Sequence, residues 1–179
     1  MNQDDLNLIR AAKKGRAEAI VDLIRNYNNF VFRTAFGVLQ NHLDAEDVAQ
    51  EVFIKVHRSL KSLRDEKTFP TWIARITVRT ALDFLNHSNK HQLTTLDPDR
   101  LQTVENSHEA SELRLDIEQA LGQLNHEQRT ILILREFQGF DYEELAQILD
   151  IPVGTVRSRL HHARTQIRLI LSGERGQAR

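Results

Sequence analysis

The sequence is poor in the residues that make cross-links, sharp turns and membrane spans. Its 179 residues include no cysteine, 3 prolines and 7 glycines. Without cysteine, disulfides, thiolate metal ligands and thiol catalysis are excluded. The apolar runs are far shorter than the roughly 20 residues that cross a bilayer, and the acidic start, Met1–Asp5, is unlike a signal peptide. We therefore expect a cytoplasmic protein with no direct membrane insertion.

Aromatic residues are also scarce, at 6%, whereas residues that favour helices are abundant. Leu, Ile, Ala, Glu, Gln and Arg dominate the composition, and these residues are compatible with helix interiors. The chain is 40% apolar and 27% charged, which is typical of a globular protein and excludes a fully disordered one. This composition predicts an all-α fold.

Apolar residues recur with helical spacing in two regions of the sequence. The first occupies about residues 6–84, and the second begins near residue 109. Between them the sequence is polar and lacks periodicity, as expected for a linker. We predict two helical domains, residues 1–90 and 111–175, joined by a flexible linker at residues 91–110.

Capping residues mark where several of these helices should begin. A Ser, Thr, Asp or Asn that caps a helix is often followed, three residues later, by a side chain that bonds back to it. Proline is tolerated in the first turn. Gly139 should end the helix that Asn125 opens. The predicted starts are Asp44 with Asp47, Thr68 with Pro70, Asn125 with Gln128, and Asp141 with Glu144.

The charges of the second domain are sorted along the sequence, which the net charge of −1 conceals. The segment 151–171 contains no Asp or Glu but four arginines. The stretch immediately before it carries Asp141, Glu143, Glu144 and Asp150. A near-neutral total therefore hides a basic face, which is the electrostatic feature expected of an element that binds nucleic acid.

The basic segment follows the pattern of a helix-turn-helix. A short helix at Tyr142–Leu149 carries the small Ala146 where a second helix can cross it, and Asp150–Pro152 is short enough for the turn. In the second helix, which Pro152 should start, an apolar stripe is expected to face the core. That stripe consists of Val153, Val156, Leu160 and Ala163.

The remaining polar side chains of this second helix should face outward and contact DNA. Early residues of a recognition helix reach base edges in the major groove, and later residues contact phosphates. Adjacent histidines point about 100° apart on a helix, which disfavours a metal site. The alternative interpretation is a solvated basic surface helix. The predicted DNA contacts are Thr155, Arg157, Ser158, Arg159, His161, His162 and Arg164.

An acidic face is predicted on the helix that follows Asp44. Asp47, Gln50 and Glu51 share one side of this helix. They form either a docking surface for a basic partner or an ordinary solvated face. The opposite side should face the core, because apolar residues recur there every four positions, at Val48, Val52, Val56 and Leu60.

The next helix, at residues 69–86, interleaves aromatic and basic groups at Trp72, Arg75 and Arg79. Such an arrangement can stack bases and hold a single strand, although a tryptophan is also a common core residue. The polar loop before this helix, residues 61–67, either cradles an extruded base or is an ordinary surface loop.

Taken in order, four segments resemble the extracytoplasmic-function (ECF, group IV) sigma factors of bacterial RNA polymerase. The resemblance covers nearly the whole chain, apart from the linker and the last few residues. The final segment is the most specific of the four. The segments are Asp44–Phe53, Phe69–Val78, Asp141–Ala146 and Pro152–Leu160.

This resemblance implies a role for each domain. The first would be sigma region 2, which binds the β′ clamp helices of the polymerase core through Asp47, Gln50 and Glu51 and recognises and melts the −10 promoter element. The second would be sigma region 4, a winged-helix-like helix-turn-helix that reads the −35 element and contacts the β flap. An anti-sigma factor and a response to stress or to the cell envelope are also implied. The implied −10 contacts are Arg64, Lys67, Trp72, Arg75 and Arg79.

Two positions depart from the family pattern, and both bear on promoter preference. Arg79 stands where the family often has asparagine, and His162 stands where a basic residue is common. The main rival function is a stand-alone helix-turn-helix regulator, which would need a ligand pocket or a dimer seam that the first domain does not display. An enzyme is not supported by any glycine-rich phosphate loop, nucleophile–base pair or metal cluster. We expect no cofactor, no metal and no small-molecule substrate.

Overall fold

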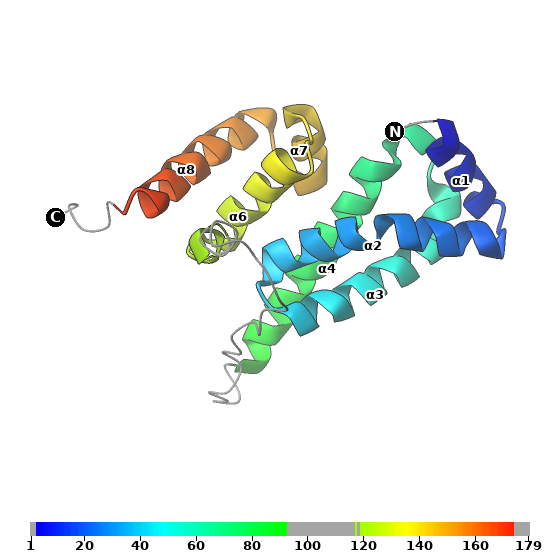
Figure 1. Cartoon of the computed structure of the whole chain (residues 1–179), viewed down its shortest axis with the longest axis horizontal. Helices are drawn as coiled ribbons and strands as arrows, with labels where there is room; N and C mark the ends of the chain where they lie inside the picture. The colour runs from blue at the N-terminus through cyan, green and yellow to red at the C-terminus, as the bar shows by residue number, and fades with distance from the viewer. Residues whose placement is uncertain (1–2, 93–116, 118, 174–179) are drawn as a thin grey trace. The chain divides into compact units, whose positions relative to one another are not determined.

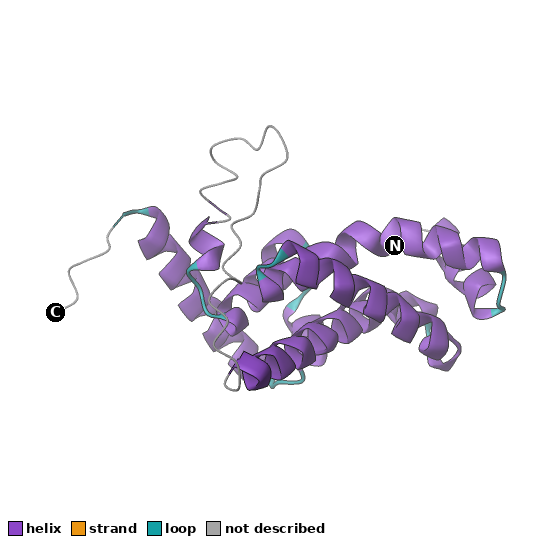
Figure 2. Ribbon diagram, turned by 90° about the horizontal axis from the view of Figure 1, so that it is seen from below, coloured by secondary structure: helices purple, strands orange, loops and turns teal. Residues whose placement is uncertain are grey.

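The computed structural model describes residues 3–92, 117 and 119–173, and every regular element in these residues is a helix (Figures 1 and 2). Contacts divide the chain into two compact units, Met1–His91 and Gln92–Arg179. The all-α fold predicted from composition is therefore confirmed. Among the described helices, none has an apolar stretch long enough to span a membrane.

The N-terminal unit is built from four helices that share one hydrophobic core. α1 packs on α2, and α2 runs along α3 (Figure 1). Every helix contributes fully buried side chains, among them Ile9 from α1, Val31 from α2, Val48 and Val52 from α3, and Phe69 and Ile73 from α4. The helices are α1 (Gln3–Lys13), α2 (Ala17–Leu39), α3 (His42–Ser59) and α4 (Phe69–Gln92).

The start of α3 differs from the prediction. The helix begins at His42 rather than at Asp44, and Asn41 caps it by accepting a hydrogen bond from the backbone N–H of Asp44 at 3.1 Å. Asparagine caps helices as well as aspartate does. Asp44 then lies in the first turn, where its negative charge interacts favourably with the positive end of the helix dipole. The apolar stripe was predicted correctly, because Val48, Val52, Val56 and Leu60 are all buried.

The two ends of α4 agree unequally with the prediction. The helix begins at Phe69, with Pro70 in its first turn, as expected. It continues to Gln92, beyond residue 87, where the apolar periodicity fails. Periodicity reports burial rather than helicity, and the segment 87–92 contains no proline or glycine to end the helix. Most of the predicted linker lies outside the described residues.

The C-terminal unit is held together by its last helix, which packs against both α6 and α7. Its core includes the fully buried Ile131, Leu134, Leu145, Ile148 and Leu160. The described elements are α6 (His126–Leu132), the π-helical turn η4 (Ile133–Phe137), α7 (Tyr142–Leu149) and α8 (Val153–Leu171). The sequence predicted the extent of α6 and η4 as one helix but not the π-helical turn within it.

Capping interactions fix the helix boundaries of this unit. Asn125 caps α6, accepting from the N–H of Gln128, and Asp141 with Glu144 forms the predicted capping box at the start of α7. Gly139 has a φ of +79°, a left-handed conformation that suits glycine and ends the preceding helix. Asp150, at the end of α7, is also left-handed, with a φ of +57°. Pro152 is the N-cap of α8 rather than its first helical residue.

Candidate nucleic-acid interface

The helix α8 has one buried and one open side. Val156, Leu160 and Ala163 are buried, and Val153 is half-buried, so the predicted apolar stripe faces the core. Four of the predicted DNA contacts are exposed, namely Arg157, Ser158, His161 and His162. The other three, Thr155, Arg159 and Arg164, are half-buried.

Two of the arginines predicted to contact DNA are held by carboxylates from other elements of the same unit. Nη2 of Arg159 lies 3.2 Å from Oε1 of Glu127. Arg164 donates from Nη2 and Nε to Oε1 of Glu136 in η4, at 2.6 and 3.0 Å. The hydrogen bond that Arg164 donates to Glu136 raises the pKa of its guanidinium, and the one it donates to Tyr142 adds to this effect. Among the described residues, Arg157 has no such carboxylate partner.

Further cations support the helix-turn-helix from inside, and sequence reasoning did not single them out. Arg135 donates to the carbonyl oxygen of Phe140 at 2.7 Å and lies 5.2 Å from the centre of the Tyr142 ring. Arg129 is buried, and burial lowers the pKa of its guanidinium to about 10. Arg129 donates to the carbonyl oxygen of Leu121 at 3.5 Å, so the two arginines bind backbone on either side of α6 and η4.

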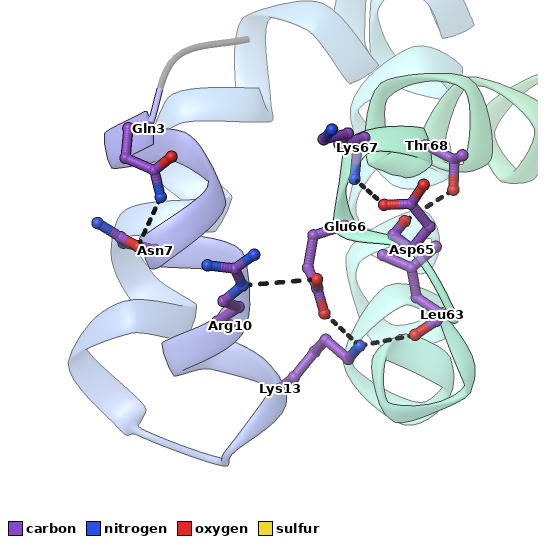
Figure 3. Close-up of polar contacts among 9 residues, drawn as sticks. All are labelled: Gln3, Asn7, Arg10, Lys13, Leu63, Asp65, Glu66, Lys67 and Thr68. Carbon is purple, nitrogen blue, oxygen red and sulfur yellow. Dashed lines mark hydrogen bonds and ion pairs between the residues drawn. The ribbon is translucent and has the colours of Figure 1, made fainter.

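In the N-terminal unit, the segment between α3 and α4 forms two short 3₁₀ turns, η1 (Leu60–Ser62) and η2 (Glu66–Thr68). Asp65 caps the second, because its side chain accepts from the N–H of Lys67 at 2.9 Å and its carbonyl oxygen accepts from Thr68 at 2.8 Å (Figure 3). Arg64 and Lys67, the two candidate DNA contacts in this segment, are exposed. The segment is thus an ordered structure that presents two cations.

The three candidates on α4 differ in accessibility. Trp72 is half-buried and packs on the core, with its ring centre 5.7 Å from that of Phe69. Arg75 is also half-buried, whereas Arg79 is exposed. Trp72 therefore has a structural role as a side chain that packs on the core.

The candidate docking residues Asp47, Gln50 and Glu51 are all exposed, on the side of α3 opposite the buried valines. Glu51 pairs with Lys55 at 2.8 Å, and Lys55 donates to the hydroxyl of Thr80 on α4 at 3.1 Å. Two apolar side chains of the same helix are also exposed, Leu43 by 63% and Ile54 by 51%. Exposed apolar groups beside an acidic face are more typical of a surface that binds a protein than of a surface that contacts only water.

Two family models match the chain. Sigma-70 region 2 matches residues 23–91, and sigma-70 region 4 matches residues 114–167. Together they place a sigma-factor region in each of the two units. The class of protein is therefore an RNA polymerase sigma factor.

Curated relatives narrow this class. The RNA polymerase sigma-H factor of Pseudomonas aeruginosa is 32% identical, and the alignment covers 92% of each chain. The ECF RNA polymerase sigma-E factor of Haemophilus influenzae is 34% identical over 91% of this chain and 93% of its own. A solved structure of the sigma factor RpoE with the anti-sigma factor NepR, from Bartonella quintana, has the same fold, with a TM-score of 0.69 and 23% identity over 86% of this chain and 97% of that one.

The chain belongs to the ECF family of RNA polymerase sigma factors. It accordingly directs the polymerase core to specific promoters and initiates transcription. Membership in this family decides against the stand-alone regulator and assigns the chain to the initiation machinery rather than to a class of enzymes. In the part of the chain that the structure describes, no cluster of three or more acidic or histidine side chains is arranged to hold a metal ion.

Proposed function

We propose that residues 1–90 act as sigma region 2 and residues 111–175 as sigma region 4, so that the protein contacts its promoter at two elements. The observation that carries this proposal is α8, whose apolar stripe is buried while Arg157 and Ser158 are exposed on the opposite side. Run-off transcription with polymerase core tests it. A promoter-specific transcript that depends on this protein is expected, and its absence would contradict the proposal.

For the −35 element, we assign base contacts to the early part of α8 and phosphate contacts to the later part. Thr155, Arg157 and Ser158 lie in its first two turns, and His161 and His162 lie beyond them. Arginine can form two hydrogen bonds with one guanine, whereas serine and threonine can contact either a base or a phosphate. Arg159 and Arg164 would contact DNA only by sharing or exchanging their carboxylate partners.

For the −10 element, the proposed contacts are Arg64 and Lys67 in the segment before α4, and Trp72, Arg75 and Arg79 on α4. Exposed cations attract the phosphates of a melted strand, and an aromatic ring stacks on its bases. The exposure of Arg64, Lys67 and Arg79 supports this assignment most directly. Trp72 would contribute only the part of its ring that Phe69 and the core leave uncovered.

For the polymerase, we propose that Asp47, Gln50 and Glu51 bind the β′ clamp helices and that region 4 binds the β flap. Reversing one charge on a docking face opposes association more strongly than removing it. Asp47→Lys is therefore expected to abolish co-purification with polymerase core. Asp22→Lys, a reversal at an exposed acid on α2, is the matched control and should leave binding intact. Equal binding of both variants would contradict the docking assignment.

An anti-sigma factor is a further proposed partner, supported by the Bartonella quintana complex of sigma factor and anti-sigma factor that shares this fold. Such a partner would couple initiation to a signal from the envelope or from stress. The cytoplasm, where polymerase and promoter DNA meet, is the compartment we propose. Co-expression with a candidate partner, followed by the run-off assay, tests this regulation through loss of the transcript.

A further inference from the structure

A lysine at the end of α1 holds the segment that carries Arg64 and Lys67. Nζ of Lys13 donates to the carbonyl oxygen of Leu63 at 2.7 Å and to Oε1 of Glu66 at 2.6 Å (Figure 3). Nε of Arg10 lies 3.6 Å from Oε2, the other carboxylate oxygen of Glu66. We name Lys13, Glu66 and the Leu63 carbonyl the α1 brace. Its two anchor points lie on either side of Arg64.

The α1 brace is sheltered more than most charged pairs of this unit. The side chains of Lys13 and Glu66 are 20% and 18% exposed, whereas those of Arg25 and Asp22 on α2 are 74% and 52% exposed. Less water around a pair means less screening of its attraction. The Lys13 hydrogen bond also lowers the pKa of the Glu66 carboxyl, so Glu66 is ionised at neutral pH.

We propose that Lys13 is a positioning residue for single-strand recognition, acting by fixing segment 63–67 so that Arg64 and Lys67 face the displaced strand. The inference rests on the proposed −10 function of that segment. A loop that is ordered before it binds loses less conformational entropy on binding, which increases affinity without a new contact. A brace that fixes the backbone also fixes which bases fit, so it acts on discrimination as well as on affinity.

Holoenzyme binding to single-stranded DNA tests this inference. The probe is the non-template strand of a promoter that the holoenzyme transcribes, and its partner is the same strand with the −10 bases scrambled. Lys13→Met is expected to lower the ratio of the two affinities by about threefold to tenfold, as expected for losing the order of one or two side chains. Lys13→Arg, which keeps the charge and the donors, should restore most of the ratio.

Lys14 provides the matched control, because it is the next residue along the chain and its side chain is exposed. Lys14→Met should leave the discrimination ratio unchanged. Lys13→Gln keeps an N–H donor but loses the charge, and it should give a smaller loss of the same kind. Binding to duplex DNA that carries only the −35 element should not change in any of these variants.

Two other outcomes would overturn the inference in distinguishable ways. If Lys13→Met and Lys13→Gln lower the melting temperature but keep the wild-type ratio of the two affinities, the α1 brace stabilises the fold and has no role in recognition. The variant with both Arg64→Ala and Lys67→Ala separates this case from a failure of the proposed function. If that double variant still discriminates like the wild type, segment 63–67 does not read the strand, and the positioning role falls with it.

Discussion

The two units of this sigma factor position their candidate DNA contacts in opposite ways. In the N-terminal unit the candidate cations Arg64 and Lys67 are exposed, and their segment is held by Lys13 and Glu66, which are not candidates. In the C-terminal unit two candidates, Arg159 and Arg164, are themselves part of the scaffold through Glu127 and Glu136.

This difference shows that the number of basic residues on a helix face does not equal the number that are available to contact DNA. Charge patterning correctly marks α8 as basic, but the acids that bind two of its arginines come from α6 and η4. An arginine already paired with a carboxylate gains less from a phosphate than an unpaired one does. We therefore expect Arg157 to contribute most to promoter affinity and Arg164 most to the geometry of α8.

The largest expected effect is at Arg157. Arg157→Ala should cost the holoenzyme roughly 1–3 kcal/mol in promoter binding and relax one position of the −35 element. It should not lower stability, because the side chain is exposed. Competition binding on promoter and random duplexes measures the effect, with Arg168→Ala, near the end of α8, as the control. An equal loss on both duplexes would assign Arg157 to phosphate alone.

The next largest effect is expected in the turn between η4 and α7. Gly139→Ala should lower the free energy of unfolding of the C-terminal unit by about 1–2 kcal/mol, because alanine is strained at a φ of +79°. A methyl group at this position meets no atom within 4 Å, so the cost is one of backbone conformation. Denaturant unfolding measures it.

Gly154→Ala is the matched control for this substitution. It also meets no atom within 4 Å, but it lies inside α8 at an ordinary φ. It should stabilise the unit by about 0.5–1 kcal/mol. Destabilisation by both alanines would mean that steric crowding, not backbone conformation, governs these positions.

A smaller effect is expected at Arg164, and it tests the comparison directly. Arg164→Ala should lower stability by at most about 1 kcal/mol, because the side chains of Arg164 and Glu136 are 42% and 47% exposed and solvent screens the pair. Its loss of promoter affinity should be smaller than that of Arg157→Ala. A loss as large as that of Arg157→Ala, with unchanged stability, would show that Arg164 contacts DNA in the same way.

The smallest effect is the pH dependence of the α1 brace. The Lys13 hydrogen bond lowers the pKa of Glu66 from its ordinary value of 4.5. A carboxyl with a lower pKa in the folded state stabilises the fold above the unfolded pKa and loses this contribution as the pH falls through the folded pKa. The difference in unfolding free energy between the wild type and Glu66→Gln should therefore shrink on acidification below 4.5.

Urea unfolding at a series of pH values measures this change. Asp22→Asn removes an acid whose side chain is 52% exposed and serves as the control. A difference between the wild type and Glu66→Gln that stays constant across the acidic range would mean that the pair with Lys13 does not form in solution.

Much of the fold could be predicted because local signals and burial agree. The four-residue repeat from Val48 to Leu60 gave the buried side of α3, and Asp141 with Glu144 gave the start of α7. The predicted start of α3 was wrong because Asn41 and Asp44 are both good capping residues, and the local sequence does not decide between them. The π-helical turn η4 had no sequence signature.

The sequence could predict which segments carry the candidate sites, but not which side chains pair with one another there. Lys13 and Glu66 are 53 residues apart, and Arg164 and Glu136 are 28 residues apart. Such pairs depend on how helices pack, which periodicity does not report. Exposure on a helix face, by contrast, follows directly from helical geometry, which is why Asp47, Gln50 and Glu51 lie where the sequence predicted.

The pair between Arg164 and Glu136 has a consequence for the ionic-strength dependence of promoter binding. Each unpaired cation that meets a phosphate releases condensed counterions from the DNA, and the slope of log affinity against log salt counts these cations. A cation that exchanges one carboxylate for a phosphate leaves an acid behind that gathers its own counterions. The region 4 contribution to the slope should therefore count Arg157 in full, and Arg159 and Arg164 only in part.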